Sequence, residues 1–194
     1  MTLALTFDPL VTIDPGVHRH AIAYGEGEAL DQVYFETIEG LAPNAFRPST
    51  YVTIENPRIG RQTRGKDPND QMDLAVAVGE LRGVFRTRGI VAELLTPSEW
   101  KGSVKKPLHH WRVWQTLRLA ERQRFAEGAA RYGRTKTPAD IEAKIKAACL
   151  RLKLTGEVSG YSWQAHNLLD AAGLFLFKRG RLGRAGQRSG VFGA

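Results

Sequence analysis

The hydrophobic period of this 194-residue chain changes once, near residue 69, and the change limits the folds that it can adopt. Before that point, short β-branched runs alternate apolar and polar residues, which is the pattern of half-buried strands. These runs cover residues 10–14, 18–24, 31–38 and 49–55. Tight turn signals such as Pro15-Gly16 separate the first three runs, which predicts an antiparallel meander.

After residue 69, apolar residues recur at helical spacing, with Asn69 as a cap and Gly89 as the end of the helix. A fifth strand over residues 90–95 follows, and a strand–helix–strand order implies parallel pairing through a crossover. The remaining pattern predicts helices over residues 107–125, 137–152 and 163–177. The expected fold class is therefore α/β, with a five-stranded mixed sheet (antiparallel strands 1–3, parallel strands 1-4-5) and helices on both faces.

The length predicts one domain, which we assign to residues 1–177. Residues 178–194 contain five Lys/Arg, five glycines and no acid, so we expect a flexible basic tail that buries no core. No apolar run approaches the roughly 18 residues of a membrane-spanning helix, and the first residues make a poor secretory signal. With the single Cys149, this predicts an intracellular, reducing, cytoplasmic setting without a membrane.

The chain carries 28 Lys and Arg against 20 Asp and Glu, a formal net charge of +8, and this excess favours a polyanionic partner. Three acids stand out against that background. Asp14 ends the first expected strand, Glu55 ends the fourth, and Asp170 lies on the very apolar last helix. Taken singly, they could be a turn aspartate, a solvated strand end and a helix-rim acid.

If the first and fourth strands are neighbours, Asp14 and Glu55 project near the same sheet edge. Burying carboxylates is costly unless they are paired or bind metal, and oxygen ligands suit Mg²⁺ or Mn²⁺. Two such ions about 4 Å apart would clamp a phosphodiester, one activating the attacking water and the other stabilising the leaving oxygen. The three acids therefore predict a two-metal site.

Several segments resemble known motifs. Val11–Gly16 (V-T-I-D-P-G), Val52–Glu55 (V-T-I-E) and His166–Leu174 (H-N-L-L-D-A-A-G-L) are similar to the acidic motifs of RuvC-like Holliday junction resolvases, in the same order. Leu95–Gly102 (L-T-P-S-E-W-K-G) is similar to a segment of phage-type members. The resemblance runs from about residue 10 to residue 177. It implies a ribonuclease H-like fold, a homodimer, and a bacterial or phage-infected host cell.

The resemblance also implies an Mg²⁺-dependent (or Mn²⁺-dependent) endodeoxyribonuclease that uses two ions per active site to nick opposed strands of a four-way DNA junction. Asp14, Glu55 and Asp170 become catalytic metal ligands by position. Either His166 or Asn167 supplies the fourth ligand. We favour His166, because imidazole is the better ligand and a plausible general base, whereas Asn167 could instead orient the water. Where the family often carries an aromatic wedge after the glutamate, this chain has only Ile59.

Two sets of basic residues are candidate phosphate contacts, although a solvated charged loop is the ordinary interpretation of such runs. The set beside Glu55 comprises Arg58, Arg61, Arg64 and Lys66, and the set that follows Trp100 comprises Lys101, Lys105, Lys106 and Arg112. We expect the tryptophans to lie in the core rather than to stack on bases. No sequence feature encodes base readout, so recognition would rest on backbone geometry and junction shape.

The leading hypothesis is thus a structure-selective DNA endonuclease that resolves four-way (Holliday) junctions. A second hypothesis keeps the fold and changes the substrate to a flap, a single strand or an RNA–DNA hybrid. A third is a basic DNA-binding module whose acids bind no metal. Cleavage of matched junction, duplex and hybrid substrates would separate the first two hypotheses, and Mn²⁺ titration would identify the third.

Overall fold

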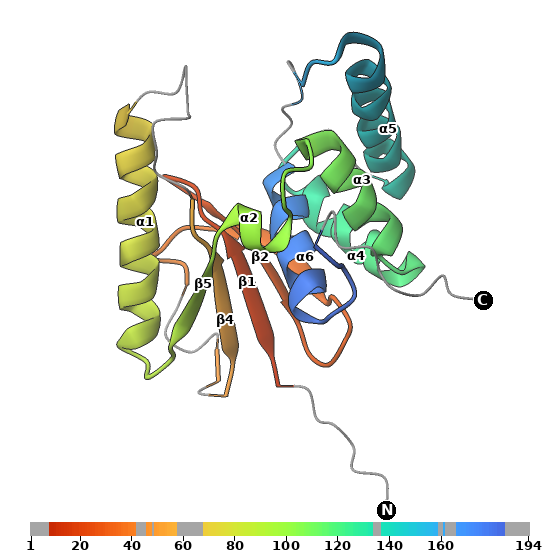
Figure 1. The fold of residues 1–194 in the computed structure, drawn as a ribbon. Helices are drawn as coiled ribbons and strands as arrows, with labels where there is room; N and C mark the ends of the chain where they lie inside the picture. Colours follow the sequence, from red (N-terminus) through yellow and green to blue (C-terminus); the bar gives the residue numbers. More distant parts are fainter. Residues whose placement is uncertain are drawn as a thin grey trace, which may run out of the picture.

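In the computed structural model of the chain, the described residues are 8–41, 46–47, 49–57, 68–133, 137–158, 161 and 166–184. The centre of the molecule is a five-stranded sheet in the order β3-β2-β1-β4-β5 (Figure 1). Its strands are β1 (Leu10–Asp14), β2 (His20–Gly25), β3 (Gln32–Glu36), β4 (Tyr51–Glu55) and β5 (Ala92–Leu95).

The strand directions match the expected mixed sheet. β1–β2 and β2–β3 are antiparallel, whereas β1–β4 and β4–β5 are parallel. Helix α1 (Pro68–Arg86) is the crossover that connects β4 to β5. This order and these directions are those of a ribonuclease H-like fold, so the predicted fold class is confirmed.

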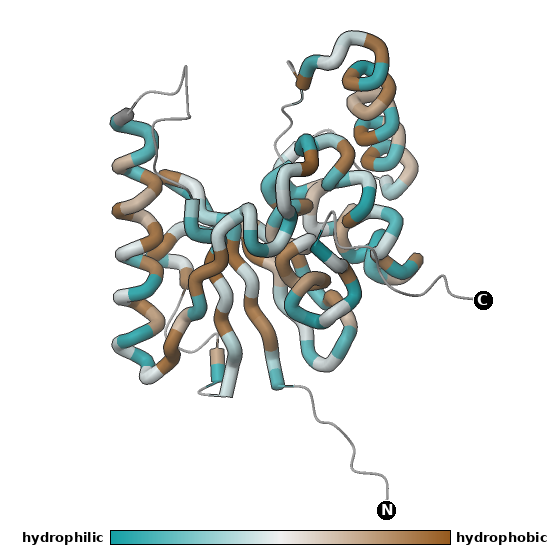
Figure 2. The backbone as a smooth tube through the Cα atoms, in the orientation of Figure 1, coloured by the Kyte–Doolittle hydropathy of each residue, from teal (hydrophilic) through white to brown (hydrophobic). Residues whose placement is uncertain are grey.

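Each face of the sheet carries its own core, because side chains alternate along a strand. Val11 and Ile13 of β1 pack with Leu81 and Phe85 of α1, and all four are fully buried. Leu10 of the same strand packs toward the other helices. The strands of the central sheet are largely apolar along their length (Figure 2). The sheet is therefore the middle layer of three, and residues of one strand serve two different cores.

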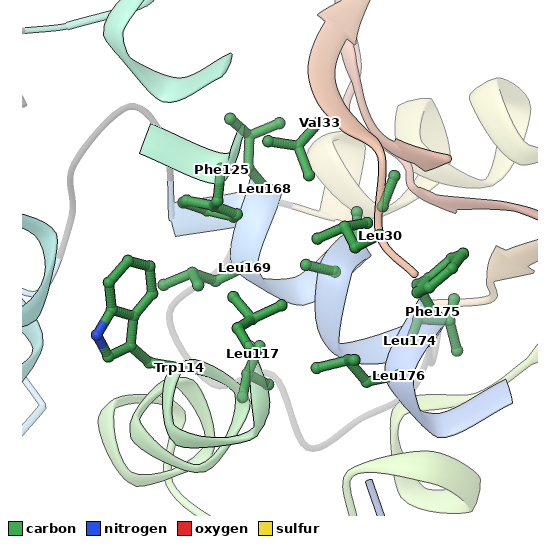
Figure 3. Close-up of a cluster of buried hydrophobic side chains, with 14 of the residues drawn as sticks. Leu30, Val33, Trp114, Leu117, Phe125, Leu168, Leu169, Leu174, Phe175 and Leu176 are labelled. Atoms are coloured by element: carbon green, nitrogen blue, oxygen red, sulfur yellow. The ribbon is translucent and has the colours of Figure 1, made fainter. Parts of the chain in front are cut away.

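The second face is covered by α6 (His166–Lys178) and α4 (Leu119–Ala130). Helix α3 (Lys106–Thr116) packs on α6, α5 (Pro138–Thr155) packs on α3 and α4, and the short α2 (Pro97–Trp100) follows β5. In this core, Leu168, Leu169 and Leu174 of α6 lie among side chains from β3, α3 and α4 (Figure 3). Trp100 and Trp114 are fully buried, so the expectation that these tryptophans belong to the core is confirmed for both.

The single helix predicted over residues 107–125 was wrong, because the chain breaks into α3 and α4. Leu117 and Arg118 adopt extended backbone with ψ angles of 131° and 159°. The cause is a buried glutamate. Glu121, 2% exposed, accepts the backbone N–H of Arg118 at 2.7 Å and that of Leu30 at 2.9 Å, which starts a new helix at this point.

Two contacts set the position of α6 over the sheet. The buried Thr12 hydroxyl donates to the Ala171 carbonyl at 2.8 Å. Gly173 lets α3 and α2 approach closely, since a Cβ there would lie 2.8 Å from Val113 Cγ2 and 3.0 Å from the Trp100 ring. These contacts fix which residues of α6 face the ends of β1 and β4.

The C-terminal segment continues to pack after α6. Arg181 pairs with Glu121 at 2.5 Å and Leu182 is buried, so the packed body extends beyond the expected boundary at residue 177. Residues 185–194 of the predicted tail lie outside the described residues. None of the helices in the described ranges combines the length and apolar character needed to span a bilayer.

Candidate functional site

Two of the predicted acids lie at the carboxyl ends of neighbouring parallel strands. The β1–β4 register pairs Ile13 with Ile54, so the next residues, Asp14 and Glu55, stand level on strands about 4.8 Å apart. Side chains alternate along a strand, and Thr12 points toward α6, where its hydroxyl meets the Ala171 carbonyl. Asp14, two residues later, therefore points to the same face of the sheet as Thr12. Glu55 lies on that face too, since it contacts Trp100 beneath α6.

Asp170 completes the cluster from α6 and is only 2% exposed. Its Oδ1 lies 3.2 Å from the Lys101 ammonium and 3.3 Å from His110 Nε2, and its Oδ2 lies 2.8 Å from the Lys106 ammonium. A buried carboxylate is stable only when such partners compensate it. These three partners compensate the burial of the Asp170 carboxylate, so Asp170 is a buried acid and not a solvated acid on the rim of the helix.

Lys101 joins Asp170 to Glu55. Its ammonium lies 3.1 Å from Glu55 Oε2 and 3.2 Å from Asp170 Oδ1. These contacts hold the two carboxylates within about 6 Å of one another, a span that two metal ions about 4 Å apart can bridge. The indole N–H of Trp100 also donates to Glu55 Oε2, at 3.0 Å. Trp100 and Lys101, which are consecutive in the chain, thus both contact the Glu55 carboxylate.

The local sequence explains why Trp100 and Lys101 reach the site. β5 ends at Leu95, next to Glu55 in the sheet, and α2 starts immediately afterwards with Pro97. Thr96 caps this turn, because Glu99 Oε2 accepts its backbone N–H at 2.6 Å and its hydroxyl at 2.7 Å. One helical turn then carries the chain from the sheet edge to the carboxylates.

The pKa values of the three carboxyl groups shift in different directions. Burial raises the pKa of Asp14 well above its ordinary value, and the charges of Glu55 and Asp170 raise it further. Burial also raises the pKa of Glu55, against the lowering effect of Lys101. For Asp170, burial is outweighed by Lys101 and His110, which hold its pKa well below the usual range. Of the three acids, Asp14 is therefore the one whose ionised form is least compensated by its surroundings.

Lys101 responds to the same charges. Burial alone would lower its pKa, but Asp170, Glu55 and Asp14 raise it above the ordinary value. The ammonium therefore stays charged over the whole physiological range. Within the described part of the chain, no three His, Cys, Asp or Glu side chains already share one ion-sized space, and the Lys101 ammonium lies between two of the acids.

The donor chemistry nevertheless fits a divalent cation. All three acids supply carboxylate oxygens, which are the ligands that Mg²⁺ and Mn²⁺ prefer. The raised pKa of Asp14, caused by burial and by two neighbouring carboxylates, indicates a place where added positive charge is favourable. If the site binds a divalent ion, Asp14, Glu55 and Asp170 are the residues whose chemistry fits it.

Sequence reasoning missed the imidazole that meets Asp170. His110 is fully buried, and its Nδ1 lies 2.7 Å from the Tyr161 hydroxyl while Nε2 faces Asp170. Burial lowers its pKa, an effect that Asp170 opposes. His109 is also buried, packs edge-on against Trp100, and has its pKa lowered to about 3 by burial. The adjacent pair His109-His110 was the one sequence signal that could have indicated this contact. The direction in which the two side chains point is set by the packing of α3 against α6, which the sequence does not show.

The other predicted site residues have different surroundings. His166 is the first residue of α6, and its ring lies 6.4 Å from that of His110. Asn167 follows it and is partly buried. Lys105 donates to the Gly156 carbonyl at 2.7 Å, and Arg112 donates to the Gly183 carbonyl at 2.8 Å. The remaining predicted contacts, Arg58, Arg61, Arg64 and Lys66, lie outside the described residues, as does Ile59.

No protein-family model matches the sequence, and no curated protein matches it. Two solved structures are similar to this chain at 14% identity, each match covering 90% of this chain and 98% of the other. They are T. thermophilus RuvC in complex with a Holliday junction substrate, with a TM-score of 0.41, and Thermus thermophilus RuvC, with a TM-score of 0.37. The motifs above resemble those of RuvC-like proteins. The fold itself rests on the strand order of this chain's own sheet.

Proposed function

We propose that this chain is a metal-dependent endonuclease that resolves four-way DNA junctions by hydrolysing phosphodiesters in opposed strands. The observation that carries the proposal is the convergence of Glu55 and Asp170 on one lysine, with Asp14 level with Glu55 on the adjacent strand. The RuvC-like motifs and the basic balance of the chain support DNA as the substrate.

In this proposal, Asp14, Glu55 and Asp170 hold two Mg²⁺ or Mn²⁺ ions. When bound, such ions supply an activated water and stabilise the leaving oxygen. The chain's own groups do the rest. Trp100 keeps Glu55 oriented through its 3.0 Å indole hydrogen bond, and the fully buried His110 contacts Asp170 through Nε2. His166 and Asn167 stay proposed as the fourth ligand and the water-orienting residue.

Substrate binding falls to the lysines of the site. The Lys106 side chain is 37% exposed and the Lys101 side chain is 19% exposed, so both can reach solvent while they contact Asp170. A phosphate group beside the carboxylates would meet these ammoniums first, which offsets the repulsion between DNA and three acids. Lys105, Arg112 and the loop cations Arg58, Arg61, Arg64 and Lys66 remain proposed phosphate contacts.

The test is cleavage of a synthetic four-way junction, with and without Mg²⁺, followed by mapping of the nicks. Asp14→Asn and Asp170→Asn should each abolish cleavage and leave junction binding in a gel-shift assay largely intact. Glu127→Gln, a change of an exposed carboxylate on α4, is the matched control and should cleave normally. Normal turnover by either site variant, or equal rates on linear duplex, would contradict the proposal.

A paired cut also needs two active sites, so we propose a homodimer. The outer face of α1 supports this, because Met72 and Val76 are 58% and 55% exposed, and Gly79 and Gly83 leave open space beside them. Val76→Glu should convert a dimer to a monomer in sedimentation experiments, whereas Leu119→Glu on α4 should not. A wild-type chain that stays monomeric at high concentration would exclude a stable dimer.

One observation favours the alternative of a DNA-binding module without catalysis. Asp170 already has the ammoniums of Lys101 and Lys106 within 3.2 Å, which is enough positive charge to balance it without an ion. Isothermal titration with Mn²⁺ separates the two functions. A nuclease site takes up the ion and loses that uptake in Asp14→Asn, whereas a binding module takes up none.

A further inference from the structure

A groove separate from the carboxylates runs between α3 and α5. It has a volume of about 660 Å³ and is open to solvent. Its lining consists of Leu108, Trp111, Cys149, Leu150, Leu152, Lys105, Lys146 and Lys153. Leu108 on α3 and Leu150 on α5 are 44% and 58% exposed. Contiguous exposed apolar surface of this kind marks an interaction site.

The spacing of the lining residues shows that one face of each helix forms the groove. On α5, Lys146, Cys149, Leu150 and Lys153 follow the i, i+3, i+4, i+7 pattern of a single stripe. Ile141 and Ile145 of the same helix are fully buried in the core. Cys149 packs against that core, and Leu150, 58% exposed, lies between Lys146 and Lys153 on the side of α5 that faces the groove.

The rim of the groove is positively charged. Lys105 is held by a neutral acceptor, the Gly156 carbonyl, and Lys146 pairs with Glu142 at 2.7 Å. Across the described ranges of the chain, no carboxylate lines the groove or pairs with Lys105 or Lys153. At least two of the three rim charges are therefore available to a negatively charged partner.

The floor fits peptide side chains better than nucleic-acid bases. Bases bind to exposed aromatic faces, but Trp111 is the one aromatic residue of the described lining, and the Lys146 ammonium lies 5.5 Å from its ring centroid. The rest of the floor is mostly leucine, which receives branched apolar side chains. The chain's own basic segments are unsuited as occupants, because residues 178–194 contain no acid.

We propose that the α3–α5 groove binds an acidic peptide segment of another protein, with apolar side chains between Leu108 and Leu150 and carboxylates on Lys105 and Lys153. This inference does not depend on the proposed nuclease activity. It has a spatial consequence, since Lys105 precedes Lys106, whose ammonium contacts Asp170. A partner on the groove would sit directly beside the carboxylate cluster.

The test is selection of short random peptides displayed on phage against the full-length protein, followed by fluorescence anisotropy with a labelled synthetic copy of the enriched sequence. We expect acidic peptides with two or more apolar residues, whose binding weakens as salt is added. Leu150→Glu and Lys153→Glu should each weaken binding about tenfold or more. Leu119→Glu, at an 80% exposed leucine on α4, is the matched control and should bind normally.

Leu108→Ser, on the facing helix, supplies a second variant without added charge and should also weaken binding. Circular dichroism of each variant establishes that it is folded. The proposal is overturned if no peptide is enriched, if the enriched peptides are basic or uncharged, or if Leu150→Glu binds them as well as wild type. Loss of single-stranded DNA binding in Leu150→Glu would instead make the groove a nucleic-acid surface, and loss of self-association would make it an interface between copies. Either result also overturns the peptide proposal.

Discussion

Replacing Lys101 by methionine removes the ammonium that lies between Glu55 and Asp170 and keeps most of the length of the side chain. That nitrogen lies 3.1 Å from one carboxylate and 3.2 Å from the other. Without it, two buried acids repel each other with less compensation. We therefore expect Lys101→Met to fold but to be clearly less stable in the absence of divalent metal.

The size of the loss follows from the contacts that remain. Breaking a buried ion pair by removing one partner costs about 3–5 kcal/mol. The Lys101 side chain is 19% exposed, Asp170 keeps Lys106, and Glu55 keeps the Trp100 indole, so the lower end applies. A loss of about 3 kcal/mol lowers the Tm of a domain of this size by about 6–12 °C.

The pH dependence has a definite sign. The carboxylates raise the folded-state pKa of Lys101, so its stabilising effect is present below the unfolded value of 10.5 and is lost as pH rises through the folded value. The folded-state pKa of Asp170 is depressed, so its effect is present above the unfolded value of 3.8 and is lost as pH falls through the folded value. The wild-type advantage is therefore fully present only where the carboxylates are ionised and Lys101 is charged, and the raised pKa values of Asp14 and Glu55 move its acid limit above their ordinary values. It shrinks in acid, where the variant's carboxylates accept protons.

The assay is urea denaturation followed by circular dichroism, at two pH values, with EDTA or with Mn²⁺. Lys105→Met is the control, because its ammonium meets only a backbone carbonyl and its loss costs less than about 1.5 kcal/mol. Mn²⁺ should restore part of the stability of Lys101→Met, since a ligand that binds only the native state stabilises it. Equal unfolding midpoints for the two variants in EDTA would refute the reasoning.

Three further predictions concern other parts of the structure. Burial and two neighbouring carboxylates raise the pKa of Asp14, so ionised Asp14 destabilises the fold. Asp14→Asn should therefore unfold at higher urea than wild type at pH 7 in EDTA, and the difference should vanish in acid. Glu121→Gln should lose about 3 kcal/mol in the same assay, because it breaks a buried pair with Arg181. This wild-type advantage should fade as pH drops below 4.5, since hydrogen bonds from Arg181 and two backbone amides outweigh burial and lower the pKa of Glu121. Gly173→Val should cost about 1–3 kcal/mol by overpacking against Val113, measured as a lower thermal midpoint.

Local sequence patterns were sufficient for the sheet. β1 has the predicted bounds, and β4 ends at the predicted residue, because an alternating run closed by an acid and a turn is a local signal. The convergence of Asp14 and Glu55 could also be predicted, since parallel neighbours with acids at their carboxyl ends must place them at one edge. The register of Ile13 with Ile54 confirms that placement.

The sequence did not predict features that depend on distant partners. The break between α3 and α4 depends on Glu121 accepting the amide of Leu30, 91 residues away. The role of His110 depends on α3 lying against α6, and no periodicity indicates which face of a histidine pair turns inward. Lys101 was predicted to bind phosphate, and nothing local indicated that its ammonium would lie between two carboxylates.

The charges of the site lead to a last prediction under the proposed function. When ionised, Asp14, Glu55 and Asp170 carry three negative charges against the two positive charges of Lys101 and Lys106. Burial raises the pKa of Asp14, and the charges of Glu55 and Asp170 raise it further. A divalent ion held by these carboxylates would compete with the Lys101 ammonium for Glu55 and Asp170, and Lys101 would then be available to contact a phosphate oxygen. Lys101→Met should therefore bind Mn²⁺ more tightly than wild type in isothermal titration and cleave junctions more slowly. Unchanged Mn²⁺ affinity would show that Lys101 and the ion do not compete for the same carboxylates.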